Sequence, residues 1–515
     1  MKYALCIFVL LLALSQQQLV LAQGGGDLVQ QAVAAQGGAA ALRGLKGLAI
    51  QGDARFWEPG QTFAPGGEPR FLGDATFAVT WDLAAGRARL AWDRDQQYPP
   101  PAIKMKYTET LLPTLGFVTD DKGMSLPMSG IRVAAQGREL ARSSPWLLVK
   151  ALDESSKVRP AGTQRLGGQT LPAVTYADGG ATLTILFDGR THLPAAIRTR
   201  DDDNIHGDSN YDLVLADWKA VGGAQVAHSL SYRVNDVEVA KLTYRNVTAN
   251  PTMAADTFAV PDSVRGKTKP PATGTVPYQW VLRRIFLTRF ADTDNIIFPD
   301  GGGLKLVELT PNVQHVQGGG ANNLIIAMKD HLVIFDAPYG ELQSRWVIDA
   351  AKAKYPGKPI RYLVLTHHHM DHTGGMRTYV AEGAKVIVPS GAKAYFEMDA
   401  KAPHTVVPDE LQRRPRTAEV QEVRDQLTLK DEVSEVRLYN IPNPHVQGYL
   451  LAHVVTGNLV YVTDLISPRG PIARNENTVP VGDALRKYGI TGATIVGGHG
   501  TTAKQADIGP ALAAN

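Results

Sequence analysis

Hydrophobic and polar positions alternate along most of the first half of the chain. Short stretches such as Leu48–Phe56, Ala181–Phe187 and Tyr211–Trp218 show this pattern and are separated by Asp-Gly, Gly-Gly or Asn-Asp turn pairs. A period of two is typical of strands that bury one face. Helical patterns are confined to a few stretches, which are Asp27–Gln36, Ala39–Leu45 and Ile131–Leu152. The first half therefore predicts an α+β domain with a curved antiparallel sheet.

The pattern changes after a stretch rich in proline, lysine and glycine. Residues 266–303 begin with this composition, which predicts a linker, and continue into an apolar connecting helix near Tyr278–Phe290. From Leu304 onward, apolar strands rich in branched residues alternate with helical stretches. We therefore expect an N-terminal domain at residues 23–265 and a second domain at residues 304–515, and we expect the two to fold separately.

A histidine-rich stretch follows one of these apolar strands. Thr366–Gly375 has the sequence Thr-His-His-His-Met-Asp-His-Thr-Gly-Gly. In extended backbone, His367 and His369 point to the same side, because side chains alternate along a strand. Asp371 and His372 follow where the loop turns, so they can face a second point nearby. Clustered imidazoles and a carboxylate at the tip of a strand predict a metal site.

This stretch resembles the His-x-His-x-Asp-His motif of the metallo-β-lactamase superfamily, in the form found in glyoxalase II-like members. The resemblance implies an αββα sandwich for residues 304–515. It also implies three more ligands at the ends of later strands, and His445, Asp464 and His499 stand there in the expected order. Asp336, which follows an earlier hydrophobic strand, matches the residue that supports the metal loop in the family.

The resemblance divides the candidate ligands between two metal ions. One ion would be held by three histidines and the other by an aspartate and two histidines, with one more aspartate as the bridge: His367, His369 and His445; Asp371, His372 and His499; and Asp464. Imidazole and carboxylate ligands without thiolate favour two zinc ions, with iron or manganese as alternatives. Asp371 is also the predicted catalytic residue, because it is placed to orient an attacking hydroxide.

The expected function is that of a metal-dependent hydrolase, which cleaves an ester, thioester, lactone or phosphoester with a hydroxide held between two ions. Two alternatives stay open, a carrier or binding protein with an accessory metallo-domain and a mononuclear iron dioxygenase on the same fold. The missing cysteine ligand and the bridging Asp464 argue against penicillin hydrolysis. The strand pattern around Phe187–Pro194 and Tyr211–Tyr232 resembles that of periplasmic lipoprotein-carrier half-barrels, which leaves the carrier alternative in place.

Composition and the first residues narrow the possible partners and location. The 515 residues include 53 basic and 50 acidic side chains, so the basic excess typical of nucleic-acid binding is missing and we expect a small-molecule substrate. Residues 1–22 combine Lys2, an apolar core and small residues before Gln23, which predicts a signal peptide and export to the periplasm or the medium. The apolar core Ala4–Leu14 is too short to span a bilayer, so we expect no stable membrane insertion of the mature chain, although an uncleaved anchor is the alternative.

Overall fold

The computed structural model describes residues 25–178, 181–268 and 303–514. Contacts divide the chain into two compact units, and each is described here by itself. The second unit contains the described residues from 303 onward and two segments from the first half of the sequence, Glu58–Arg70 and Asp202–Asp208. The predicted signal peptide, the connecting helix and most of the predicted linker lie outside the described residues.

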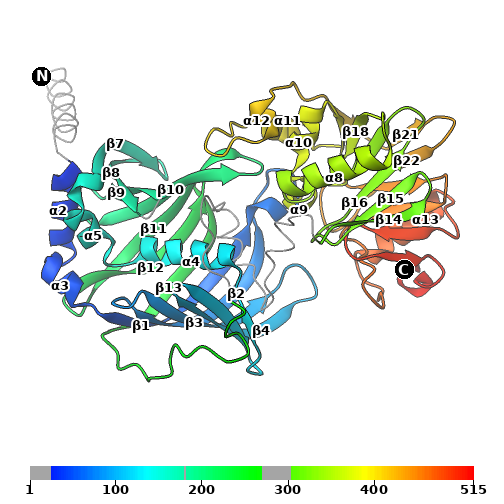
Figure 1. Cartoon of the computed structure of the whole chain (residues 1–515). Coiled ribbons are helices and arrows are strands. Elements are labelled where there is room, and N and C mark those ends of the chain that lie inside the picture. Colours follow the sequence, from blue (N-terminus) through cyan, green and yellow to red (C-terminus); the bar gives the residue numbers. More distant parts are fainter. Residues whose placement is uncertain (1–24, 179–180, 269–302, 515) are drawn as a thin grey trace, which may run out of the picture. The chain divides into compact units, whose positions relative to one another are not determined.

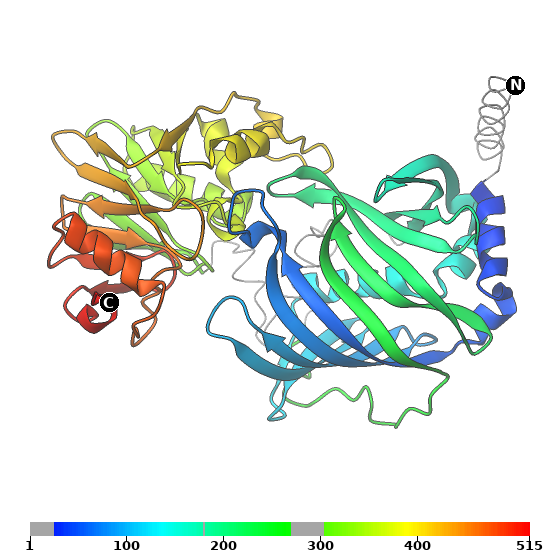
Figure 2. The same ribbon diagram turned by 180° about the vertical axis from the view of Figure 1, so that it is seen from behind.

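One large antiparallel sheet forms the framework of the first unit, as predicted, and Figures 1 and 2 show that it is curved. Its 13 strands are hydrogen-bonded in the order β6-β5-β4-β3-β2-β1-β13-β12-β11-β10-β9-β8-β7. The strands are β1 (Gly47–Glu58), β2 (Arg70–Asp82), β3 (Arg87–Gln96), β4 (Ile103–Leu112), β5 (Leu115–Asp120), β6 (Ser125–Pro127), β7 (Val158–Leu166), β8 (Gln169–Asp178), β9 (Ala181–Phe187), β10 (Pro194–Asp203), β11 (Gly207–Val221), β12 (Ala224–Val234) and β13 (Val237–Ala249). Buried and exposed positions alternate along β1, so the sheet buries one face.

Four α-helices belong to the described part of the first unit, and they confirm the predicted helical stretches. They are α2 (Gly25–Ala35), α3 (Gly38–Gly44), α4 (Gly130–Ser143) and α5 (Leu147–Asp153). Ser129 caps α4, because its side chain accepts a hydrogen bond from the backbone N–H of Arg132. Leu28 of α2 and Val149 of α5 share one hydrophobic core with Trp92 of the sheet. The helices therefore cover part of the apolar face of the sheet.

The second unit contains two sheets. The first sheet has the order β14-β15-β16-β17-β18-β19-β20 and the second β21-β22-β23-β24-β25-β26. Their strands are β14 (Lys305–Thr310), β15 (Val313–Gln317), β16 (Asn323–Ala327), β17 (Leu332–Phe335), β18 (Ile360–Val364), β19 (Lys385–Pro389), β20 (Val420–Val423), β21 (Gln426–Lys430), β22 (Glu435–Asn440), β23 (Leu450–Val454), β24 (Leu459–Val462), β25 (Thr494–Gly497) and β26 (Thr502–Lys504). The helices are α8 (Glu341–Lys354), α9 (Met370–Thr373), α10 (Met376–Glu382), α11 (Lys393–Lys401), α12 (Glu410–Arg413) and α13 (Thr478–Lys487).

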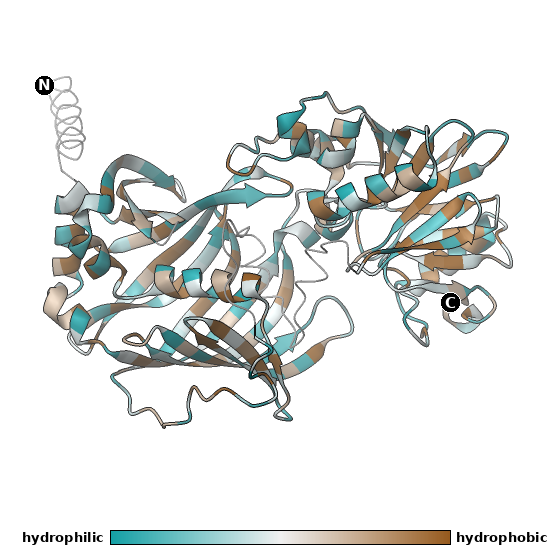
Figure 3. Cartoon of the chain, in the orientation of Figure 1, coloured by the Kyte–Doolittle hydropathy of each residue, from teal (hydrophilic) through white to brown (hydrophobic). Residues whose placement is uncertain are grey.

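Hydrophobic clusters show how these elements are layered. One cluster joins the facing sides of the two sheets, with Phe335 of β17 and Leu438 of β22 among its members. A second covers the other face of the first sheet with Val347 of α8, and a third covers the second sheet with Leu485 of α13. Strands with both faces covered are hydrophobic along their whole length, as the brown strands of this unit show in Figure 3. The predicted αββα sandwich is confirmed.

Among the described residues, no helix combines the length and the apolar composition that crossing a bilayer requires.

Candidate metal centre

The candidate residues stand where strands of the two sheets end. His367 follows β18, Asp464 follows β24 and His499 follows β25, while His445 lies in the connection from β22 to β23. Asp464 has a left-handed backbone with φ of 52°, which a residue other than glycine rarely adopts. Such strain is common at functional sites, where the surrounding structure holds the side chain in one direction.

A four-residue helix follows the strand of the motif and carries two of the candidates. Asp371 and His372 lie on α9, and α10 (Met376–Glu382) follows it. The glycines between them are required by close packing. A Cβ atom at Gly374 would lie 2.5 Å from the carbonyl oxygen of Tyr339, and one at Gly375 would lie 2.1 Å from Ser344 Oγ. The turn therefore brings α10 directly against the α8 side of the unit.

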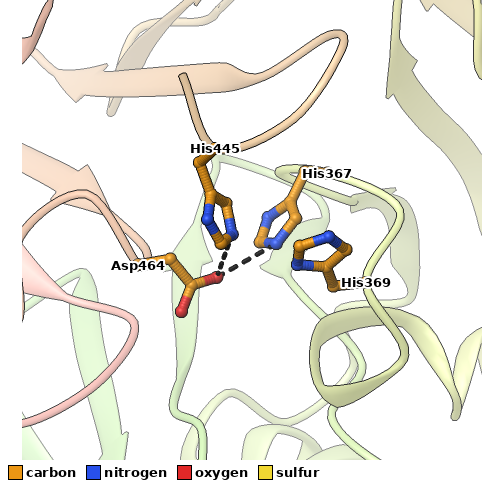
Figure 4. A group of neighbouring side chains, drawn as sticks. All are labelled: His367, His369, His445 and Asp464. Carbon is orange, nitrogen blue, oxygen red and sulfur yellow. Dashed lines mark ion pairs between the residues drawn. The ribbon is translucent and has the colours of Figure 1, made fainter. Parts of the chain in front are cut away.

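Figure 4 shows the first group of side chains, in which three imidazoles lie beside one another and one carboxylate contacts two of them. Its members are His367, His369, His445 and Asp464, and one ligand atom of each lies within 4.8 Å of the others. Nε2 of His367 lies 3.0 Å from Asp464 Oδ2, and Nε2 of His445 lies 3.3 Å from the same oxygen. All three histidines are buried. The spacing of the ligand atoms fits a single metal ion.

The second group contains Asp371, His372, His499 and, again, Asp464. Nε2 of His372 lies 3.1 Å from Asp464 Oδ2, while Nε2 of His499 lies 2.8 Å from Asp464 Oδ1. Oδ2 of Asp371 lies 3.7 Å from both of these imidazole nitrogens. The carboxylate of Asp464 therefore belongs to both groups.

Hydrogen bonds on the outer side of the imidazoles determine which ring nitrogen faces the centre. Nδ1 of His499 lies 2.7 Å from the carbonyl oxygen of Gly320, so this nitrogen carries the proton. Nδ1 of His372 lies 3.0 Å from Asp336 Oδ2. In both rings Nε2 is left to face the centre. Partners of this kind orient histidine ligands in metal sites.

Asp336 has the supporting position that the sequence predicted for it. The residue is fully buried, and its Oδ1 accepts hydrogen bonds from the backbone N–H of Thr366 at 2.8 Å and from the Thr366 hydroxyl at 3.0 Å. The hydroxyl of Tyr461 donates to Oδ2 at 3.3 Å. Asp336 thus holds the first residue of the motif as well as the ring of His372.

The buried charged groups of the centre shift one another's pKa values. Burial opposes ionisation of Asp464, but His372 and His499 outweigh it and hold the pKa of this carboxyl well below its usual range. Burial likewise opposes a charge on His372, yet Asp464 and Asp371 raise the pKa of its imidazole well above the ordinary value. Asp371 and Asp464 thus favour positive charge at the position of this ring.

A second observation, on a ring nitrogen of His369, also indicates that these residues fit a metal ion. Nδ1 of His369 is buried and, among the described residues, has no hydrogen-bond partner, while Nε2 of the same ring bonds the carbonyl oxygen of Thr62 at 2.9 Å. A buried ring nitrogen of this kind that faces other ligand atoms fits a metal ligand. The structure brings all the predicted site residues together in the two groups. Their role as metal ligands stays a prediction, and so does the role of Asp371 as the catalytic residue.

His368, the middle histidine of the motif, belongs to neither group. It is buried, and its Nε2 lies 2.9 Å from the carbonyl oxygen of Thr62. Burial lowers the pKa of its imidazole to about 4, so the ring is neutral at physiological pH. The alternation of side chains therefore separated it correctly from His367 and His369.

The sequence pattern did not indicate one part of the centre, the segment Glu58–Arg70. Nε2 of Gln61 donates to Asp371 Oδ1 at 2.6 Å, and Thr62 bonds the motif through its carbonyl oxygen. In the sequence this segment is a proline- and glycine-containing turn between two strands. A glutamine amide and a backbone carbonyl carry no motif, so nothing in the pattern indicated their role.

Comparisons with known proteins agree with this geometry. Residues 316–499 match the metallo-beta-lactamase superfamily. Over 93 residues the chain is 30% identical to the linear primary-alkylsulfatase of Pseudomonas sp., which covers 17% of this chain and 14% of that protein. Over 87 residues it is 25% identical to metallo-beta-lactamase IND-1 of Chryseobacterium indologenes, which covers 17% of this chain and 36% of that protein. The chain thus spans 14% and 36% of the lengths of these two relatives.

Solved structures with a similar arrangement come from the same group of proteins. The metallo-beta-lactamase from Pontibacter korlensis aligns with a TM-score of 0.33 and 16% identity over 41% of this chain and 97% of that one. The inverting sec-alkylsulfatase from Pseudomonas sp. aligns with a TM-score of 0.32 and 18% identity over 41% and 40% of the two chains. The second unit of this chain thus has a metallo-β-lactamase fold, and residues 316–499 within it match the superfamily.

Proposed function

We propose that the chain is an exported hydrolase with two zinc ions that share Asp464 as a bridging ligand. The observation that carries the proposal is the position of this one carboxylate. Its Oδ2 lies 3.0 Å from Nε2 of His367 in the first group and 3.1 Å from Nε2 of His372 in the second. A carboxylate within reach of both groups suits a two-metal site, in which the ions lie about 3.5–4 Å apart.

The residues of the centre would have separate roles in binding the ions and in catalysis. When bound, two zinc ions supply Lewis acidity and make water a nucleophile near neutral pH. The histidines of the two groups would hold the ions, and Asp336 and Gly320 would keep two of the rings in the tautomer that leaves Nε2 for the ion. We propose Asp371 as the catalytic residue, because its Oδ2 faces the second group and can orient the attacking water.

The proposed substrate class is a small ester, thioester, lactone or phosphoester. The resemblance of one segment to an alkylsulfatase adds sulfate esters to this class. In each of these substrates a Lewis acid polarises the oxygen of the electrophilic group and stabilises the leaving oxygen or sulfur. The superfamily consists mostly of hydrolases, which supports this choice over the carrier and iron dioxygenase alternatives.

Metal analysis combined with a substrate panel tests the proposal. The purified full chain is analysed for all transition metals, and hydrolysis of a nitrophenyl acetate, a thioester, a lactone, a phosphodiester and a sulfate ester is measured. We expect about two zinc ions per chain and turnover of at least one substrate, lost on chelation and restored by zinc. One iron ion per chain with oxygen consumption would favour the dioxygenase, and a metal-free chain without turnover would favour the carrier.

A further inference from the structure

The second unit takes in a segment from far earlier in the sequence. Glu58–Arg70 groups with the metallo-β-lactamase domain rather than with the strands that precede and follow it. We propose that this segment is a positioning element of the metal centre, in which Gln61 orients the carboxylate of Asp371 and the carbonyl of Thr62 orients the ring of His369. The inference rests on the proposed function, because it takes Asp371 and His369 as metal ligands.

The two carboxylate oxygens of Asp371 have different partners: one accepts a hydrogen bond from Gln61 and the other faces the metal centre. The side-chain amide of Gln61 donates to Oδ1 at 2.6 Å. The other oxygen, Oδ2, is the one that lies 3.7 Å from the Nε2 atoms of His372 and His499. The amide therefore restrains rotation of the carboxylate and keeps Oδ2 directed at the centre. Because the amide is neutral, it does this without cancelling the negative charge that attracts the cation.

The carbonyl of Thr62 does the corresponding work for His369. It accepts hydrogen bonds from Nε2 of His369 and Nε2 of His368, each at 2.9 Å. With the proton of His369 held on Nε2, the lone pair lies on Nδ1, which is the buried nitrogen of the first group. Thr62 therefore has for His369 the role that Gly320 has for His499.

The segment is built to hold Gln61 in place. Residues Pro59–Gln61 form a 3-10 turn whose first N–H groups are capped by Glu58, which accepts from the N–H of Gly60 at 2.7 Å. Glu58 is only 2% exposed, so this cap is shielded from water. A proline at the start of the turn restricts the backbone further. The amide of Gln61 thus starts from an ordered backbone.

Further bonds attach the segment to the loop that carries His445. The guanidinium of Arg70 donates from Nε to the carbonyl oxygen of Gln61 at 2.6 Å and from Nη2 to the carbonyl oxygen of His445 at 2.8 Å. The backbone N–H of Gln447 donates to the carbonyl oxygen of Phe63 at 2.7 Å. The segment therefore contacts both the histidine motif and the later ligand loop. Ligand groups far apart in the sequence are held through one short turn.

Substitution of Gln61 in the full chain tests the proposal. Gln61→Met keeps the length of the side chain and removes the donor, while Gln61→Glu places a second carboxylate against Asp371. The matched control is Glu68→Gln, which changes an exposed residue of the same segment. Circular dichroism and thermal melting show that each variant is folded. The affinity for each ion is measured by competition with a chelator, and Co²⁺ is then substituted for zinc to record its d–d absorption.

We expect Gln61→Met to weaken binding of the second ion by 10- to 100-fold, as loss of a supporting hydrogen bond does at other metal sites. The Co²⁺ spectrum should change at the same time, a readout that a merely structural role would leave unaltered. Gln61→Glu should weaken binding at least as much, and Glu68→Gln should bind both ions like the wild type. Wild-type affinity and an unchanged Co²⁺ spectrum in both Gln61 variants would overturn the inference and leave the proposed function intact. A wild-type chain that binds fewer than two ions would instead overturn the proposed function.

Discussion

Asp371 and Asp464 are both aspartates of the same centre, yet their surroundings differ. Asp464 belongs to both ligand groups, whereas Asp371 presents one oxygen to the second group and the other to Gln61. Asp371 is thus oriented by an uncharged donor. The motif predicted its candidate ligands because their residue types and their spacing can be read within one short stretch of sequence. It could not predict Gln61, whose contact depends on the path of the chain.

Replacing Asp371 by alanine should therefore affect chemistry far more than folding. We expect Asp371→Ala to lower kcat by two or more powers of ten, because the change removes a metal ligand and the group that orients water. Steady-state kinetics on the best substrate of the panel measures the loss. Asp483→Ala, which changes an exposed aspartate of α13, is the control.

His368→Ala gives a second comparison within the same motif. Because His368 bonds Thr62 and stands outside both groups, we expect lower thermal stability and a much smaller loss of kcat than for Asp371→Ala. Equal damage to kcat by the two substitutions would contradict the assignment of the motif.

At the scale of elements, the helices α8 and α10 support the metal-binding motif. Glu382 ends α10 and accepts from Arg345 of α8 at 2.9 Å, from Lys352 of α8 at 2.5 Å and from Arg414 at 3.1 Å. These bonds tie α10 to α8, and α10 follows the metal-binding motif directly. Period-two and apolar patterns predicted most strands. They did not predict β4, β5, β6 or β7, and in β7 the mainly exposed positions leave little hydrophobic pattern.

The free energy of unfolding should depend on the charge of Glu382, and this dependence should be seen at acidic pH. Burial opposes its ionisation, but hydrogen bonds from Lys352 and Arg345 outweigh this and lower the pKa of Glu382 from 4.5 to about 2. A carboxyl whose pKa is lowered by folding stabilises the protein above its unfolded pKa, and the contribution is lost as pH falls through the folded value. We expect Glu382→Gln to reduce the free energy of unfolding at pH 7 by about 1–2 kcal/mol, allowing for solvent screening.

The difference between wild type and Glu382→Gln should shrink as the pH falls from 4.5 towards 2. Chemical unfolding at a series of pH values measures it. Glu397→Gln, which removes a looser pair with Lys393 on α11, should show little effect at any pH. A constant difference across this pH range would mean that Glu382 stabilises through packing and not through its charge.

At the scale of the whole molecule, the two units do not follow the order of the sequence. The predicted domains at residues 23–265 and 304–515 assign every residue by its place in the chain, whereas contacts assign Glu58–Arg70 and Asp202–Asp208 to the second unit. The sequence could not indicate this, because both segments are short turns beside strands. The separability of the two predicted domains, and the likeness of the first to lipoprotein-carrier half-barrels, stay predictions.

A fragment that begins at Gly266 tests how much the earlier segments matter. It keeps every predicted ligand but lacks Gln61 and Thr62, so we expect it to bind the second ion about 10- to 100-fold more weakly than the full chain. Chelator competition on a fragment shown to be folded by circular dichroism measures this. Residues 23–265 alone should bind no zinc tightly. Equal metal affinity in the fragment and the full chain would show that the early segments are dispensable.

Gln61 and Asp371 are 310 residues apart in the sequence. Contacts between distant residues form late when a chain folds, because the chain must lose much of its freedom before they are made. The histidines of the motif lie within one strand–helix connection and can gather early. The centre would then pass through an immature stage, in which an ion is captured by local ligands and Asp371 still rotates. Metal capture and the onset of activity should therefore be separate events in time during refolding.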